Sequence, residues 1–162
     1  MHACELAQEL GIPRVLVPLY PGLLSALGVA IADVVKDYAH TVMLRGESLT
    51  RAVIDQAFLP LESHAMEELS LEGFQDKRLS LQRLLDVRYI GQSYELPVPC
   101  PVDSNSTLQE LVAEAFHEAH EQRFGHSDPT QGVEVVNVRL KAVGYMEKPV
   151  LKTTTAQAGK GT

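Results

Sequence analysis

Three histidines lie close together between residues 116 and 126, with Glu121 among them. Imidazoles and carboxylates are common zinc ligands in proteins. His117 and His120 are three residues apart, whereas the zinc-protease pattern needs two histidines four apart with glutamate after the first. On a helix we expect His117 to point away from the apolar face and His120 to lie on its flank. We favour a solvated helix face near a negative helix C-terminus, with a zinc site of His117, Glu121 and His126 as the alternative.

The string RYIGQSYELPVP, residues 88–99, holds the second group of candidates. Gly91-Gln92 separates two apolar strands and has the length of a tight hairpin turn, so we expect Tyr89 and Tyr94 to be cross-strand aromatic residues. The turn and the two aromatic residues favour a structural role for this string over a catalytic one. The amide of Gln92 is the group best suited to hold a polar ligand or a neighbouring loop.

Ser25 is a third candidate, because it lies just inside a predicted helix whose free N–H groups can bind an anion. A serine nucleophile needs a base and an orienting carboxylate, and neither is signalled nearby. With Ala26 and Gly28 it is better explained by close packing of a helix of small residues. The sequence has no Walker-type loop and no GxGxxG motif, which argues against a glycine-lined phosphate site.

The elements that must position these residues fall into two parts. Residues 1–32 are predicted to form a helix that ends at Gly11, a short strand over 14–18, a turn at 20–22 and a second helix over 23–32. No Ser, Thr, Asp or Asn caps the first helix, and one strand is too little sheet for a domain. We therefore expect residues 1–32 to be a remnant of a larger domain.

Residues 33–148 are predicted to alternate strands and helices. The strands are expected at 34–45, 81–90, 93–98 and 135–146, and the helices at about 50–73 and 107–125. Ser48 or Thr50 is expected to cap the first helix, and Ser104, Ser106 or Thr107 the second, where Thr107 and Glu110 fit a capping box.

The order strand, helix, strand, strand, helix, strand predicts an α+β, ferredoxin-like βαββαβ fold. In this fold a four-stranded antiparallel sheet has both helices on one face, and a looser α+β arrangement is the alternative. Pro60 is expected either to kink the first helix or to open a second one. Pro97 and Pro99 either end their strand or place it at an edge. We expect residues 149–162 to be disordered, because most of this segment, the tail KTTTAQAGKGT, has no apolar side chain larger than that of alanine.

Composition narrows the classes of function. A net charge of −7 without clustered Lys and Arg argues against nucleic-acid binding. The apolar runs are too short to span a membrane. Cys4 and Cys100 are far apart and lack metal-type spacing, so we expect reduced thiols and a cytoplasmic location.

Three segments resemble the hydantoinase A / 5-oxoprolinase family, which includes N-methylhydantoinases and relatives of acetone carboxylase. These are residues 2–34, which begin HACELAQELGIPRVLVPLYPG, the string RYIGQSYEL, and the helix end at 116–125. The resemblance runs from His2 to about Gly144. The family positions that we single out for testing are His2, Gln92, Tyr94, His117, His120 and His126.

The resemblance implies an ATP-dependent parent enzyme that opens cyclic amides, uses a divalent metal and acts with a hydantoinase B-type subunit. Hydantoins, 5-oxoproline and ketones are substrates of related chains. The glycine-rich turn expected before His2 is missing, so we expect a C-terminal fragment, inactive alone and without a cofactor of its own. Its role would be to pack against the remaining hydantoinase A chain or the B-type subunit, and a homodimer is a further candidate assembly. The competing hypothesis is an autonomous module that binds a small ligand or dimerises.

Overall fold

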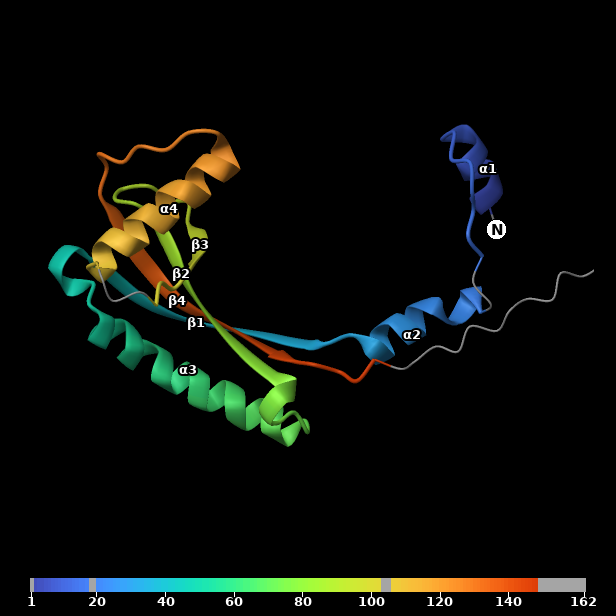
Figure 1. Cartoon of the computed structure of the whole chain (residues 1–162), viewed down its shortest axis with the longest axis horizontal. Helices are drawn as coiled ribbons and strands as arrows, with labels where there is room; N and C mark the ends of the chain where they lie inside the picture. Colours follow the sequence, from blue (N-terminus) through green and yellow to red (C-terminus); the bar gives the residue numbers. More distant parts are fainter. Residues whose placement is uncertain (1, 18–19, 103–105, 149–162) are drawn as a thin grey trace, which may run out of the picture. The chain divides into compact units, whose positions relative to one another are not determined.

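The computed structural model describes residues 2–17, 20–102 and 106–148. The chain divides into two compact units, which we call unit 1 (Met1–Ala32 with Met146–Thr162) and unit 2 (Asp33–Tyr145). Figure 1 traces both along the sequence. The predicted cap Ser104 and the predicted disordered segment 149–162 lie outside the described residues.

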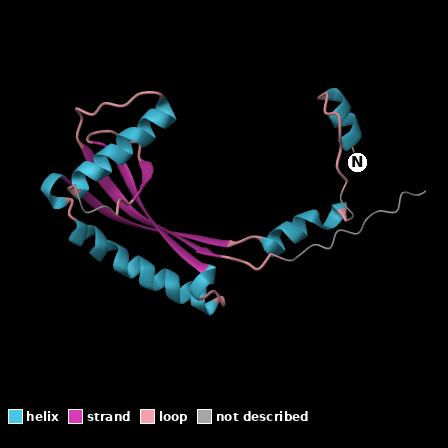
Figure 2. Ribbon diagram, viewed as in Figure 1, coloured by secondary structure: helices cyan, strands magenta, loops and turns pink. Residues whose placement is uncertain are grey.

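Unit 2 is an α+β domain built on a four-stranded antiparallel sheet (Figures 1 and 2). Its elements are β1 (Val34–Arg45), α3 (Arg51–Leu71), β2 (Leu79–Tyr89), β3 (Leu96–Pro99), α4 (Leu108–Phe124) and β4 (Val133–Gly144). The sheet order is β1-β4-β2-β3, and each neighbouring pair is antiparallel. The prediction of an antiparallel sheet with helices packed on it is confirmed.

The strand order differs from the predicted ferredoxin-like one, in which the third strand lies in the sheet interior. Here β4 lies between β1 and β2, and β3 is at the edge. Pro97 and Pro99 explain the difference, because they lack the N–H groups that a second neighbouring strand would need. The N–H of Cys100, on the opposite edge of this segment, donates to the Arg83 carbonyl at 3.0 Å. β4 contains no proline and pairs along both sides.

Capping and turn chemistry explain where the helices begin and end. Thr50 caps α3 by accepting a hydrogen bond from the Val53 N–H, and Pro60 lies inside one continuous helix instead of opening a second. Thr107 and Glu110 form the predicted capping box of α4. α4 ends at Gly125, which adopts a left-handed φ of 77° that a residue without a Cβ takes at little cost.

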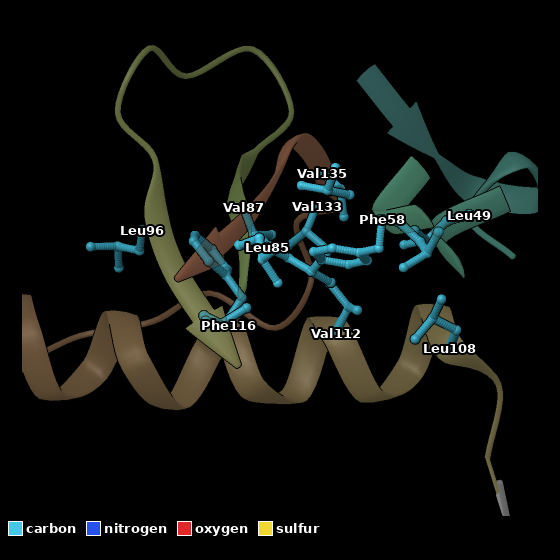
Figure 3. Close-up of a cluster of buried hydrophobic side chains, with 14 of the residues drawn as sticks. Leu49, Phe58, Leu85, Val87, Leu96, Leu108, Val112, Phe116, Val133 and Val135 are labelled. Atoms are coloured by element: carbon cyan, nitrogen blue, oxygen red, sulfur yellow. The ribbon is translucent and has the colours of Figure 1, made fainter. Parts of the chain in front are cut away.

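One hydrophobic core lies between the helices and one face of the sheet (Figure 3). α3 contributes Ile54, Phe58, Ala65 and Leu69, and α4 contributes Leu108, Val112 and Phe116. The sheet contributes residues of its inner face, among them Leu85, Val87, Val98, Val135, Val138 and Leu140. Val135 and Val138 share this face because the pairing register shifts between them. Both helices therefore cover the same face, and this arrangement fixes the C-terminal end of α4 over the end of β2.

Unit 1 contains two short helices, α1 (Ala3–Glu9) and α2 (Leu24–Ile31), with a 3-10 turn at Pro21–Leu23. The strand predicted at 14–18 is not formed in its described part, residues 14–17, since a strand needs a neighbour to accept its hydrogen bonds. Within the described residues of unit 1, only Ala7 is buried.

Candidate functional site

A cavity of about 460 Å³ lies in unit 2 at the C-terminal end of α4. The loops at residues 90–95 and 125–132 complete its walls. Its lining brings together four of the predicted candidates with five further residues: Tyr89, Gln92, Tyr94, Leu96, His120, Phe124, His126, Asp128 and Gln131. Gln92, Tyr94, His120 and His126, separated in sequence, thus share one concave surface.

Tyr89 forms the floor of this cavity. It is the last residue of β2, and its buried ring lies edge-on against Phe116 with 4.9 Å between ring centroids. Its hydroxyl accepts the backbone N–H of Asp128 at 2.7 Å and lies 3.2 Å from Nδ1 of His117. Tyr89 therefore ties β2, α4 and the loop after α4 into one rigid corner.

His117 does not point away from the apolar face as predicted. It is half-buried and contacts the Tyr89 hydroxyl, because the long tyrosine side chain extends from the end of β2 across to α4. Burial lowers the pKa of His117; the Asp128 carboxylate opposes this shift and His120 adds to it. The neutral imidazole can then accept a hydrogen bond from the Tyr89 hydroxyl at Nδ1.

His120 lies on the buried side of α4, one turn after Phe116, and not on the flank. Its Nδ1 is 2.6 Å from the backbone carbonyl oxygen of His126. A carbonyl only accepts, so Nδ1 carries a proton and the neutral ring keeps a lone pair on Nε2. Within the described residues Nε2 has no protein partner, and no buried side-chain nitrogen or oxygen is left unpaired, so Nε2 is accessible to solvent.

His126 reaches the cavity because the left-handed Gly125 reverses the chain after α4. Its ring lies 5.1 Å from that of His120. Glu121 is engaged elsewhere, accepting a hydrogen bond from the Ser127 hydroxyl at 3.0 Å. Among the described residues no three His, Cys, Asp or Glu side chains are placed to hold a metal ion, so the geometry does not support the zinc alternative.

Gln92 and Tyr94 lie in a wider loop than the predicted two-residue hairpin. The Gln92 N–H donates to the Tyr89 carbonyl at 3.0 Å, but pairing with β3 resumes only where Val87 faces Leu96. Tyr89 and Tyr94 are therefore not a cross-strand pair. The Tyr94 ring instead packs edge-on against Phe124, 5.9 Å away, at the rim of the cavity.

Leu96, Phe124, Asp128 and Gln131 were not among the predicted candidates. Asp128 shows a local signal, since its Oδ1 accepts the N–H and the hydroxyl of Thr130, two residues later, as Asp often does in turns. These hydrogen bonds lower the pKa of Asp128, so it is ionised at neutral pH. The other three carry no pattern that separates them from ordinary loop or core residues.

The two candidates of unit 1 are both exposed and lie outside the cavity of unit 2. His2 is exposed, and its Nδ1 lies 2.7 Å from the Glu5 carboxylate. Ser25 is exposed in the first turn of α2, where no side chain caps the helix.

The sheet face opposite the helices carries paired charges. Asp86, only 3% exposed, accepts two hydrogen bonds from Arg139 and one from Asn137. Arg88 lies between Glu134, at 2.8 Å, and Glu95, at 3.7 Å. Because each charge in this group has a partner, the face favours structural pairing over catalysis.

Comparison with known proteins places this fold in a family. The hydantoinase/oxoprolinase C-terminal domain model matches residues 46–161, and the hydantoinase/oxoprolinase model matches residues 1–38. The chain belongs to the hydantoinase/oxoprolinase family, as the sequence resemblance predicted.

Particular relatives are long proteins. The chain is 32% identical to the caprolactamase subunit alpha of Pseudomonas jessenii over 92% of its own length and 22% of that protein. It is 30% identical to the 5-oxoprolinase of Saccharomyces cerevisiae over 88% of its length and 11% of that protein. The crystal structure of the ATP-dependent caprolactamase from Pseudomonas jessenii aligns with 98% of the chain and 24% of its own, at 28% identity and a TM-score of 0.66.

The chain thus spans between about a tenth and a quarter of these relatives and covers only their C-terminal region. One of them is itself named as a subunit. None of the helices that the structure describes has the length and apolarity needed to cross a bilayer.

Proposed function

We propose that this chain is the supporting C-terminal part of an ATP-dependent enzyme that opens cyclic amides. Its role is to pack against the rest of the hydantoinase A chain or a hydantoinase B-type subunit, and it is inactive alone. The observation that carries the proposal is the division of the chain. One family model covers residues 1–38 and the other covers 46–161, and a boundary between the two structural units falls nearby in the sequence, between Ala32 and Asp33.

The surface of unit 1 supports a packing role. Its two helices and the residues beside them expose large apolar side chains, among them Leu6, Leu10, Leu23, Leu24 and Val29. An uncovered group of this kind is typical of a protein contact surface. Unit 2, by contrast, has a complete core of its own.

ATP and a divalent metal belong, in this proposal, to the intact enzyme. The chain has no glycine-rich phosphate loop, and the described residues offer no three-ligand group for a metal. Cys4 and Cys100 are both free thiols, which supports a reducing compartment such as the cytoplasm.

Isothermal titration calorimetry tests the inactivity of the chain by itself. The chain is titrated with ATP and magnesium, then with 5-oxoproline and with hydantoin. We expect no saturable heat at micromolar concentrations for any of them. Specific micromolar binding of ATP would overturn the proposal, because it would place a nucleotide site in the C-terminal part.

The alternative function, a module that binds a small ligand, is favoured by one observation. The cavity at the end of α4, about 460 Å³, is in the size range of small-molecule sites. Such a site is compatible with a supporting role, since a domain can pack against an enzyme and still hold a ligand.

A further inference from the structure

The cavity at the end of α4 has a buried floor and an exposed aromatic rim. Tyr89, Leu96 and His120 are buried, whereas Tyr94 and Phe124 leave 60% and 44% of their surfaces exposed. Aromatic rings held at a concave surface and left in contact with water are a feature of ligand sites, where a bound molecule covers them.

The polar groups of the lining favour a ligand that donates hydrogen bonds. His120 presents the lone pair of Nε2, since Nδ1 donates to the His126 carbonyl. Asp128 uses Oδ1 for Thr130 and keeps its second oxygen free of any partner among the described residues. The Tyr89 hydroxyl is already occupied by the Asp128 N–H and by His117. Two acceptors thus remain for a ligand.

The charge of the lining favours a cation. No lysine or arginine lines the cavity, and Asp128 is ionised, while His117 beneath it favours the neutral form. The cavity also lies at the C-terminus of α4, where unpaired carbonyls give the helix its negative end. Arg123 lines the neighbouring hollow, which shares Tyr94 and Leu96, and its charge opposes cation binding.

We propose that this cavity binds a small organic cation with N–H donors, namely a guanidinium or a primary ammonium on a short apolar chain. The N–H groups donate to His120 Nε2 and to the Asp128 carboxylate, and the cation lies against the rings of Tyr94 and Phe124. Aromatic faces attract such cations through their quadrupole. The site does not depend on the supporting role proposed above.

Binding is tested by ¹H–¹⁵N NMR titration of the full chain with ethylguanidinium and propylammonium, with N-ethylurea as the neutral isostere and propionate as the anion. We expect saturable shifts of Gln92, Gln131 and His120 with the cations, and at least tenfold weaker effects with the urea and the anion. Blocked arginine amide is titrated in parallel, and its binding at least as tightly as ethylguanidinium would identify a protein side chain as the natural source of the cation.

Variants separate the roles of the lining. Asp128→Asn, which keeps an acceptor for Thr130, should weaken cation binding about fivefold, and Arg123→Gln should strengthen it about twofold. Glu114→Gln removes one negative charge, as Asp128→Asn does, but lies on α4 outside the cavity, so it should leave binding unchanged. His120→Asn keeps a donor near the His126 carbonyl but removes the Nε2 acceptor, so it should weaken binding while the chain stays folded by circular dichroism.

Three results would overturn the proposal. The first is equal shifts with N-ethylurea and ethylguanidinium, which would show that charge plays no part. The second is an equal loss of cation affinity in Asp128→Asn and Glu114→Gln, which would reduce the effect to net charge. The third is the absence of any saturable shift with either cation up to about 50 mM. A Kd above that concentration would be too weak for a specific ligand site.

Discussion

At the scale of single residues, Tyr89 organises the candidate site. Its ring supports Phe116 and His120, and its hydroxyl joins His117 to the Asp128 backbone. The imidazoles at 117 and 120 consequently differ in role. One is a half-buried acceptor for a tyrosine, and the other is held by a carbonyl and turns its second nitrogen to solvent.

The lowered pKa of His117 predicts a pH dependence of stability. The folded protein disfavours its charged form, so the unfolded chain binds more protons as the pH falls through about 6.5, the usual histidine value, and toward the lower pKa of the folded state. This stability is fully present above about pH 6.5 and is lost below it. His117→Gln should therefore show a shallower decline in the free energy of unfolding between pH 7 and 5.

Urea unfolding at several pH values measures this decline. His40→Gln, at an exposed position of β1, is the matched control and should follow the parent chain. Parallel pH curves for the parent and His117→Gln would show that His117 does not titrate differently on folding.

Gly144 lies where the fold leaves no room for a side chain. A Cβ at this position would lie 2.7 Å from the buried ring of Phe74. Gly144→Ala should cost about 1–3 kcal/mol of stability, the usual range for overpacking a core, in chemical denaturation. Adding Phe74→Leu, which removes the ring, should make the cost of the alanine smaller. An unchanged denaturation midpoint in Gly144→Ala alone would contradict this reading.

At the scale of elements, local signals were more predictable than tertiary arrangement. The alternation of β1, the cap of α3, the capping box of α4 and the stop at Gly125 are all present. These features depend on neighbours within a few residues, which the sequence shows directly. The end of the first helix is equally local, since Gly11 adopts the predicted left-handed conformation, with φ of 65°. The width of the hairpin depends on how β2 and β3 pair, and the structure has a longer loop than the predicted two-residue turn.

The strand order depends on a constraint that the sequence contains. Two prolines in β3 exclude it from the sheet interior, yet the ferredoxin-like order would place it there. The facing of α4 was missed for another reason. The apolar stripe marked Phe116 and Ala119, but the buried position one turn after Phe116 is His120, whose polarity is offset by the His126 carbonyl. A periodic pattern cannot reveal such a partner in a later loop.

The capping box predicts a local stability effect. Thr107→Ala should lower the free energy of unfolding by about 1 kcal/mol, because the Glu110 N–H loses its side-chain acceptor. Thr107→Ser should retain most of the stability. Ser106→Ala, at the adjacent candidate cap, is the matched control. A lower Tm for Ser106→Ala than for Thr107→Ala would show that Thr107 is not the cap.

At the scale of the whole chain, the two units differ in self-sufficiency. Unit 2 has its own core and site, whereas unit 1 leaves large apolar side chains exposed. The chain should therefore bind a fluorescent hydrophobic dye and self-associate at high concentration. The double variant Leu10→Glu with Val29→Glu should reduce both. A monomer by light scattering at high concentration, without dye binding, would contradict the prediction. It would show that unit 1 has no uncovered apolar surface.

The most direct test of the supporting role uses the caprolactamase subunit alpha of Pseudomonas jessenii. Deleting the region that matches this chain should abolish its ATP-dependent caprolactamase activity, and grafting this chain in its place should restore folding and at least part of that activity. Full activity in the truncated subunit would contradict the account, because the C-terminal region would then be dispensable for the catalysis that it is proposed to support.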